Sequence, residues 1–333
     1  MRITQSVQLN PQQQEAVDHN HGPLEVIAGP GAGKTLILVE RAARLMERGQ
    51  SLSGIVLVTF TRRAAGEMRQ RLQRRLGLDV EARSLRNVCT IHALAYRVLS
   101  MSMKKAGRPG WRVADEEQDF EVLRQAMLEL DVPREIYTAK ELANQVRALQ
   151  GMPVGAQLLA EDVVLAVYQH YQRILKENRL WSLGDLVASA IKALIKDSLL
   201  GSLFGRLCVQ LMVDEWQDVS LVEYTFLKQL LRKDNLFVVG SPAQSIYGWR
   251  HAHYEALSDQ LRHDFPHLQT LVLGSNYRST QQIARACSAL LPQGYSEINL
   301  KPVRGPGPQV QVQPTYDPGS EAVSYTHLTL PTN

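Results

Sequence analysis

A glycine-rich segment near the start of the chain has the residue types that bind phosphate. It reads AGPGAGKT over residues 28–35, the phosphate-loop pattern with Ala in place of the usual first Gly. Its glycines let the backbone turn tightly, so that N–H groups can face phosphate oxygens. Lys34 can reach the β- and γ-phosphates, and the hydroxyl of Thr35 can ligate Mg²⁺. The segment therefore predicts a nucleoside triphosphate site formed by Ala28, Gly29, Gly31, Ala32, Gly33, Lys34 and Thr35.

Two acidic residues supply the partner that a phosphate loop needs. Asp214 and Glu215 directly follow an apolar run at residues 207–213, which has the composition of a buried strand. Asp214 at the tip of such a strand can hold Mg²⁺, directly or through water. Glu215 can serve as the general base that polarises an attacking water. An acidic surface turn is the simpler interpretation, but the apolar run and the phosphate loop favour a hydrolytic site.

Short apolar runs and helical patterns alternate around these segments. Runs with strand character occupy residues 24–28, 55–60, 208–213, 236–239 and 270–273. Patterns with helical period occupy residues 35–48, 62–76, 220–231 and 280–290. The alternation predicts an α/β fold with a parallel sheet flanked by helices on both faces.

The middle and the end of the chain differ from this pattern. Residues 92–200 hold helical patterns almost throughout, at 115–130, 138–150, 161–177 and 182–199, and no strand candidate stands out there. We therefore expect an inserted all-helical subdomain.

Residues 301–318 are rich in Pro and Gly, and the last ten residues, SYTHLTLPTN, continue no earlier pattern. We expect the tail at 319–333 to be unstructured and to be a truncation or read-through scar.

Composition and charge narrow the class of protein. The chain has 333 residues, 44% of them hydrophobic and 21% charged, which excludes general disorder. It has neither a signal segment nor an apolar run long enough to span a bilayer, so we expect no membrane partner. Its three cysteines form no CxxC pair, which favours a reducing, cytoplasmic compartment.

The segment between residues 62 and 86 has a local excess of positive charge, with eight arginines and three acidic residues. It is either a solvated helix face or an anion-binding surface.

Seven segments stand out in order along residues 9–290: LNPQQQEAV (9–17), AGPGAGKT (28–35), VTFTRRAAGEM (58–68), TIHALAYRVL (90–99), VDEWQD (213–218), VGSPAQSIYGWR (239–250) and NYRST (276–280). Together they resemble, in the same order, the motifs of the UvrD/Rep/PcrA family of superfamily-one DNA helicases. QSIYGWR and NYRST are highly specific in this context. Another phosphate-loop enzyme, such as a kinase, would not explain them.

The resemblance implies a RecA-like phosphate-loop NTPase fold and a division of the chain. The first RecA-like domain would comprise residues 1–91 and 204–275, separated by an inserted helical subdomain at 92–203. Residues 276–318 would begin a second, incomplete RecA-like domain.

The resemblance also implies roles at an ATP site. Gln13 would read the adenine edge, since its amide can both donate and accept, and Tyr277 would stack on adenine. Gln244 would sense the γ-phosphate. Arg278 would reach across the cleft to stabilise charge in the transition state. With the lysine and the glutamate described above, these two residues form the expected catalytic set.

A site for single-stranded or partly duplex DNA is implied on the other side of the domain. The residues there carry rings that can stack on bases or groups that can contact phosphate: Phe60, Thr61, Arg62, His92, Tyr247, Trp249 and Arg250. Taken alone, Phe60 and Trp249 are more typical of a core, and His92 of a capping residue. The motif context favours the DNA-binding interpretation.

The implied activity is ATP-driven movement in the 3′→5′ direction on single-stranded DNA, in repair or replication, by a nucleoid-associated bacterial-type protein. No later helicase motif follows Thr280, so we expect this chain alone to hydrolyse ATP poorly and not to unwind DNA. Ser241 and Ala243 stand where the family usually has acidic residues, and Leu36 where many members have Arg. A nucleotide-responsive single-strand DNA-binding module with little turnover is the alternative.

Overall fold

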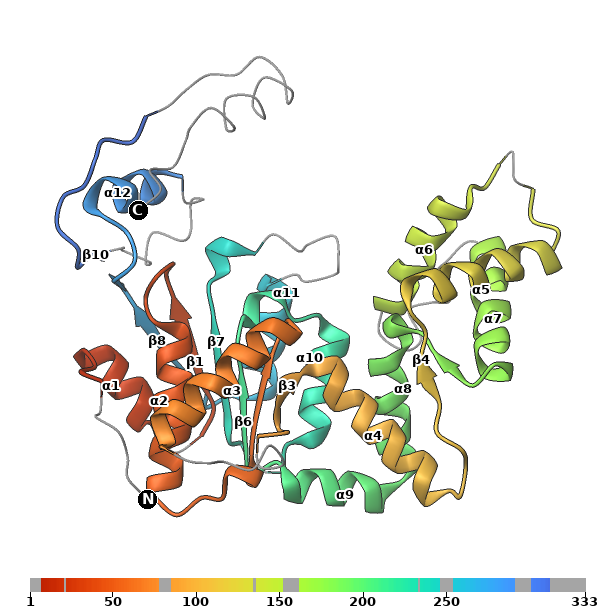
Figure 1. The fold of residues 1–333 in the computed structure, drawn as a ribbon, viewed down its shortest axis with the longest axis horizontal. Coiled ribbons are helices and arrows are strands. Elements are labelled where there is room, and N and C mark those ends of the chain that lie inside the picture. The colour runs from red at the N-terminus through yellow and green to blue at the C-terminus, as the bar shows by residue number, and fades with distance from the viewer. Residues whose placement is uncertain are drawn as a thin grey trace.

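Six parallel strands form the central sheet, in the order β3-β2-β6-β7-β1-β8 (Figure 1). The computed structural model describes residues 7–20, 22–77, 85–133, 136–151, 162–232, 234–245, 254–290 and 301–311. The strands are β1 (Leu24–Ala28), β2 (Ile55–Thr59), β3 (Val88–Thr90), β6 (Gln210–Val213), β7 (Leu236–Gly240) and β8 (Gln269–Leu273). Because all six run parallel, their carboxyl ends meet at one edge of the sheet.

Alternate residues of each central strand enter two different cores. On β2, Val56 and Val58 pack into one core, and Ile55 and Leu57 into the other. Burial on both faces explains why these strands read as continuous apolar runs. The first face is covered by α1 (Pro11–Asp18), α2 (Lys34–Glu47) and α3 (Arg62–Leu76). The second is covered by α4 (Ile91–Lys105), α8 (Leu183–Lys196), α9 (Ser198–Leu207), α10 (Leu221–Leu230) and α11 (Tyr254–Asp264). These observations confirm the predicted α/β class.

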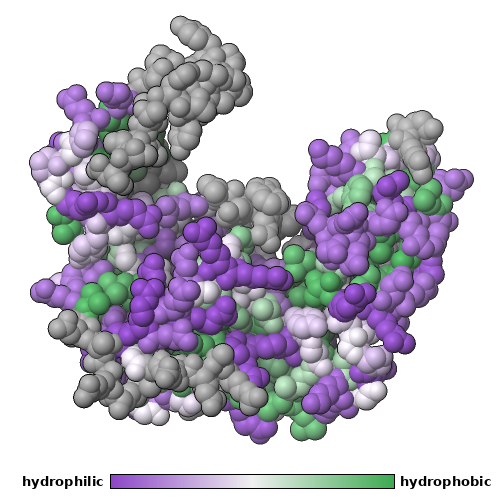
Figure 2. All heavy atoms as spheres, viewed as in Figure 1, coloured by the Kyte–Doolittle hydropathy of each residue, from purple (hydrophilic) through white to green (hydrophobic). Residues whose placement is uncertain are grey.

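Three helices form a separate lobe that stands away from the sheet (Figures 1 and 2). They are α5 (Glu116–Glu129), α6 (Ala139–Gly151) and α7 (Asp162–Glu177), and they share a core of their own. At the base of the lobe, β4 (Arg112–Val113) pairs in parallel with β5 (Leu180–Trp181), beside a contact of the Trp111 and Trp181 rings with centroids 4.4 Å apart. Strands of two residues are too short to produce a sequence pattern, so they were not predicted in this helical segment. The other helices between residues 92 and 203, namely α4, α8 and α9, pack against the sheet.

The helix expected at residues 182–199 is instead two helices, and this expectation was wrong. Asp197 ends α8, and its carboxylate accepts hydrogen bonds from the N–H groups of Leu199 and Leu200 at 3.1 Å. That side chain caps α9 and so allows a turn inside one apolar pattern. The sequence also missed β3, because three residues are too short to produce a pattern.

Beyond the sheet, β9 (Ser275–Asn276) pairs with β10 (Lys301–Pro302), and α12 (Gln281–Ala289) lies beside them. The tail expected at 319–333 lies outside the described residues. Within the described ranges, no helix is long and apolar enough to cross a membrane.

Candidate nucleotide and nucleic-acid sites

The carboxyl ends of four neighbouring strands bring the expected nucleotide-binding segments together. The glycine-rich loop follows β1, and Asp214 follows β6. Ser241 follows β7, and β9 with its Asn276 comes two residues after β8. Since the sheet order is β6-β7-β1-β8, these segments lie side by side at the edge where parallel α/β sheets bind ligands.

The loop between β1 and α2 uses glycine where its backbone requires it. Gly31 and Gly33 have φ values of 72° and 89°, in the left-handed region that favours glycine. A Cβ atom on Gly31 would lie 2.7 Å from the Cβ of Arg278 and 2.9 Å from the Oδ1 of Asn276. Gly33 is the N-cap of α2, so Lys34 begins that helix and the loop lies at its positive end. The loop therefore presents a helix N-terminus to an anion, directly beside the segment that carries Arg278.

Gln13 is fixed against this loop. Its Nε2 donates a 2.9 Å hydrogen bond to the carbonyl oxygen of Ala32, and its side chain is almost fully buried. Asn10 and Gln13 form a reciprocal capping box at the start of α1. A Cβ on Gly33 would lie 2.9 Å from Nε2, so the glycine makes room for the glutamine. One amide hydrogen and one lone pair of Gln13 remain for a ligand.

Lys34 lies between two of the residues expected to act with it. Its Nζ is 3.4 Å from the Oε2 of Glu215 and donates a 3.3 Å hydrogen bond to the Oε1 of Gln244. Gln244 comes from the 3₁₀ turn η4 (Pro242–Gln244), which is separated from β7 by Ser241 alone. The loop lysine, the candidate base and the candidate γ-phosphate sensor, distant in sequence, thus meet at one point.

Asp214 and Glu215 have different environments. Asp214 is buried, and its N–H donates to the carbonyl oxygen of Val58 at 2.9 Å. Burial, reinforced by the neighbouring Glu215, raises the pKa of Asp214 to about 7. Glu215 is more exposed and has a φ of 51°, a left-handed conformation that is rare outside glycine and typical of functional sites. The two carboxylates are thus suited to separate roles.

Gln217 joins the turn after β6 to the turn after β7. It lies in η3 (Trp216–Asp218) and is almost fully buried. Its Nε2 donates to the Oε2 of Glu215 at 3.0 Å, and its Oε1 accepts the N–H of Ser241 at 2.8 Å. A Cβ on Gly240 would lie 2.9 Å from that Oε1, so the approach needs glycine. Sequence reasoning did not single out this residue.

The residues expected to hold Mg²⁺ have suitable chemistry. The Thr35 hydroxyl and the Asp214 carboxylate are hard oxygen donors, which Mg²⁺ prefers. A cation near Asp214 would favour its ionised form, against the raised pKa. In the parts of the chain that the structure covers, no three His, Cys, Asp or Glu residues form a metal-binding cluster. This is compatible with Mg²⁺, which usually keeps waters and binds through few carboxylates and substrate phosphates.

Tyr277 and Arg278 are positioned by two asparagines that the sequence analysis did not select. The Oδ1 of Asn276 accepts the N–H groups of Arg278 at 2.9 Å and Ser279 at 2.8 Å, an Asx-type turn. The N–H of Tyr277 donates to the carbonyl oxygen of Gly31 at 3.0 Å. The Nδ2 of Asn10 donates to the Oη of Tyr277 at 2.7 Å. The side chains of Tyr277 and Arg278 are exposed beside the loop.

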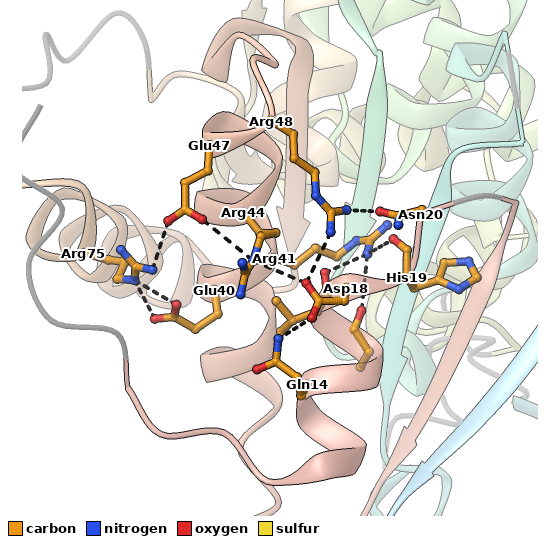
Figure 3. A network of polar contacts seen from close by, with 12 residues as sticks. Gln14, Asp18, His19, Asn20, Glu40, Arg41, Arg44, Glu47, Arg48 and Arg75 are labelled. Atoms are coloured by element: carbon orange, nitrogen blue, oxygen red, sulfur yellow. Dashed lines mark hydrogen bonds and ion pairs between the residues drawn. The ribbon is translucent and has the colours of Figure 1, made fainter.

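A buried arginine fixes α1 to the sheet. The guanidinium of Arg41 donates to three carbonyl oxygens at the C-terminal end of α1, at 2.6 to 3.3 Å, and lies 4.4 Å from the ring centroid of Phe237. Burial lowers its pKa to about 10. Figure 3 shows Arg41 within a wider set of contacts, in which Asp18 of α1 pairs with Arg44 and with Arg48. These contacts hold the helix that carries Gln13.

Four of the residues expected to bind DNA line one open cleft of about 1190 Å³: Phe60, Thr61, Arg62 and His92. The hydroxyl of Thr61 accepts the N–H of Ala64 at 3.0 Å and so caps α3. The Nδ1 of His92 lies 3.8 Å from the Oε1 of Glu223. The other three expected residues, Tyr247, Trp249 and Arg250, lie outside the described residues.

The parallel sheet, with a glycine loop, a lysine and an acidic pair at its carboxyl edge, defines a RecA-like nucleotide-binding class of protein. The model of the UvrD/REP helicase N-terminal domain family matches residues 9–266, and the chain belongs to this family.

Curated relatives are similar over most of the chain. ATP-dependent DNA helicase UvrD1 of Mycobacterium tuberculosis (strain ATCC 25618 / H37Rv) is 32% identical over 305 residues, which cover 85% of this chain and 39% of that protein. ATP-dependent DNA helicase PcrA of Bacillus subtilis (strain 168) is 32% identical over 304 residues, covering 88% of this chain and 40% of the relative. PcrA of Staphylococcus aureus (strain NCTC 8325 / PS 47) is 30% identical over 293 residues. The chain thus spans about two fifths of the length of these relatives.

Proposed function

We propose that this chain is the N-terminal part of an ATP-dependent DNA helicase or translocase that moves 3′→5′ on single-stranded DNA. The meeting of Lys34 with Glu215 and Gln244 carries the proposal, because it unites three separate segments around one phosphate position. The family membership and the similarity to proteins named as ATP-dependent DNA helicases support it. Repair or replication of DNA in a bacterial-type cytoplasm is the proposed setting.

Each side chain at the sheet edge has a proposed part in ATP hydrolysis. Gln13 and Tyr277 bind the adenine, and the loop N–H groups with Lys34 hold the phosphates. Thr35 and Asp214 hold Mg²⁺, which neutralises phosphate charge when bound. Glu215 takes the proton of the attacking water. Gln244 and Arg278 contact the γ-phosphate, where a planar guanidinium stabilises developing charge.

The proposed DNA site lies at the start of α3 and α4. Phe60 stacks on a base, while Thr61, Arg62 and His92 contact the backbone. We propose that Tyr247, Trp249 and Arg250, which follow Gln244 in the sequence, also bind the DNA. Gln244, which contacts Lys34, stands three residues before Tyr247 in the sequence, so the proposed γ-phosphate sensor and the proposed DNA-binding residues belong to one stretch of chain. That connection is the proposed route by which hydrolysis is coupled to movement.

In the proposed motor, residues 1–91 and 204–275 belong to the first RecA-like domain, 92–203 to an inserted subdomain, and 276–318 to the start of a second domain. ATP in such motors lies between the two domains. We therefore propose weak turnover for this chain alone.

Steady-state ATPase rates with and without a single-stranded oligonucleotide test the proposal. The proteins are this chain, its Lys34→Ala variant and a protein extended through a complete second domain. DNA-stimulated turnover in the extended protein, lost on K34A, is the expected result. An extended protein that binds DNA without turnover would instead support the nucleotide-responsive DNA-binding module.

A further inference from the structure

The outer side of α9 carries a row of leucines. The helix is buried along its inner side, where Leu200 and Phe204 enter the core that covers the sheet. On the outer side, Leu199, Leu203 and Leu207 recur at every fourth residue, which places them along one face of the helix. Leu199 is 70% exposed, Leu207 is 43% exposed, and Leu203 is half-buried. We call these three side chains the α9 leucine face.

Further apolar side chains are exposed at both ends of this helix. Ile195, near the end of α8, is 66% exposed, and Val209, two residues after α9, is 45% exposed. Figure 2 shows hydrophobic side chains gathered at the lower edge of the molecule, where α9 lies in Figure 1. Single exposed apolar residues are ordinary, but a row of them on the outer side of a helix is typical of an interaction surface.

α9 is held firmly in place, so the leucine face is a fixed surface. Asp197 caps the helix and forms an ion pair with Lys105, with Nζ and Oδ2 2.6 Å apart. In the middle of the helix, Arg232 donates a 2.8 Å hydrogen bond to the hydroxyl of Ser202 and lies against Gly205. A partner would therefore meet a preformed row of side chains, which lowers the entropic cost of binding.

The charges beside the leucine face are mostly positive. Lys192 and Lys196 are exposed near the end of α8, and Arg206 is exposed in the last turn of α9. Within the described residues, none of these three forms an ion pair. The acidic residue in the same stretch, Asp197, is paired already. Arg232 adds a further cation across the helix. Apolar side chains bordered by cations fit a partner that carries acids beside its own apolar face.

This surface lies at the opposite edge of the sheet from the nucleotide segments. β6 begins at Gln210, three residues after α9 ends at Leu207, so α9 lies at the amino end of that strand. Asp214 and the glycine-rich loop lie at the carboxyl ends of the strands (Figure 1). A partner bound to α9 would therefore leave the proposed ATP site open.

The charges also distinguish between possible occupants. In a symmetric pair of copies the same patch meets itself, so the cations around Arg206 would face one another. An anionic bilayer would match the charge, but the exposed side of α9 carries no aromatic ring of the kind that anchors helices at a membrane interface. A helix with a row of apolar side chains can pack directly against the leucine row.

We propose that the α9 leucine face binds an acidic amphipathic helix of another protein. Apolar side chains of that helix cover Leu199, Leu203 and Leu207, and its carboxylates lie beside Lys196 and Arg206. The proposal goes beyond the proposed function and does not depend on it.

Anisotropy titration with a fluorescent peptide tests this. The peptide has about 18 residues, long enough to form a helix, with leucines three and four apart and glutamates elsewhere. It should bind the wild-type chain. Leu199→Gln and Leu207→Gln should each weaken binding about tenfold, as expected when one leucine is no longer buried. Lys196→Gln and Arg206→Gln should each weaken it by up to roughly fivefold, and added salt should reduce these losses.

Leu128→Gln is the matched control, because Leu128 is also an exposed leucine on a helix, α5, but lies in the separate lobe. It should bind the peptide like the wild type. Affinity for a single-stranded oligonucleotide should be the same in L199Q, L207Q and the wild type, which shows that the variants are folded. A wild-type chain that binds the peptide but no oligonucleotide would contradict the proposed function and leave this proposal standing.

Five outcomes would overturn the proposal. The peptide does not bind, or it binds L199Q and L207Q as tightly as L128Q. A peptide with serine in place of leucine binds equally well, so that charge alone is responsible. A protein extended through a complete second domain no longer binds the peptide, so that the chain itself covers the face. Sedimentation shows a dimer that L199Q abolishes, so that the occupant is a second copy. Phosphatidylglycerol vesicles compete fully with the peptide for the wild type, so that the occupant is a lipid surface.

Discussion

The side-chain amide of Asn10 donates a 2.7 Å hydrogen bond to the phenol oxygen of Tyr277, 267 residues further along the chain. The Oδ1 of the same asparagine accepts the N–H of Gln13 at 2.8 Å and caps α1. One side chain therefore fixes both residues proposed to bind adenine. Its two roles can be separated, because only the reach to Tyr277 depends on the length of the side chain.

Asn10→Ser should weaken ATP binding without unfolding α1, since Ser caps helices about as well as Asn but is too short to reach Tyr277. Tyr277→Phe removes the same hydrogen bond from the other end. Each change should cost about 0.5–1 kcal/mol, roughly two- to fivefold in Kd, and the double variant should be no weaker than either single one. Inorganic tripolyphosphate, which lacks a base, should bind all three variants like the wild type. Additive losses would show that the two side chains act independently.

Gly31→Ala should weaken ATP binding far more than Gly49→Ala does. Both Gly31 and Gly49 have left-handed backbones, so alanine strains each by about 1–2 kcal/mol. Only at Gly31 would the new Cβ also meet backbone-attached atoms, with the Cβ of Arg278 at 2.7 Å, whereas nothing lies within 4 Å at Gly49. Thermal unfolding should show a similar, modest loss of stability for both variants. ATP titration should show more than a tenfold loss of affinity for G31A alone. Equal ATP affinity in both variants would contradict this.

Local patterns were enough to predict the sheet and the loop at its edge. An apolar run followed by AGPGAGKT, and another followed by Asp214 and Glu215, specify strands whose carboxyl ends must meet in a parallel sheet. The meeting of Lys34 with Glu215 follows from this topology. The family resemblance supplied Gln244, whose role no local pattern reveals.

The residues that position the site were beyond sequence reasoning. Asn10, Gln217 and Asn276 act through contacts with distant segments or with backbone atoms, and nothing in their neighbourhood distinguishes them from ordinary turn residues. The packing of α4 and α8 against the sheet was missed for a related reason. An amphipathic pattern shows that a helix has an apolar face but not which partner covers it.

A buried carboxylate in β1 should make stability depend on pH. Glu25 is almost fully buried and accepts a 2.9 Å hydrogen bond from the hydroxyl of Tyr254, yet burial raises its pKa above its usual range. From about pH 4 up to that raised pKa, the folded state binds more protons than the unfolded state, so stability falls as pH rises and then levels off.

Glu25→Gln keeps the acceptor for Tyr254 and removes the charge, so its stability relative to wild type should improve as the pH rises above about 4.5 and then level off once Glu25 is ionised in the folded wild type. Urea unfolding at several pH values measures this. Glu15→Gln, a change at an exposed residue of α1, serves as the control and should follow the wild type throughout. A constant difference between E25Q and wild type at all pH values would mean that Glu25 does not titrate in this range.

Gln217→Glu should slow hydrolysis more than it weakens ATP binding. The new carboxylate still accepts the N–H of Ser241, but it loses the hydrogen bonds to Glu215 and Asp218 and places a like charge beside the proposed base. Because no part of Gln217 is assigned to the nucleotide, the kcat of a protein extended through a complete second domain should fall at least tenfold with KM nearly unchanged.

Gln14→Glu is the matched control, because it also places a carboxylate beside an acid, Asp18, but in the α1–α2 network of Figure 3 rather than at the sheet edge. It should leave kcat unchanged. A Q217E protein with normal kcat but raised KM would show that Gln217 supports nucleotide binding rather than the base. Gln217→Ala removes all three side-chain contacts, with Glu215, Asp218 and Ser241. It should therefore also lower stability by about 1–3 kcal/mol, the cost of leaving buried groups unpaired, which Q217E largely avoids at Ser241.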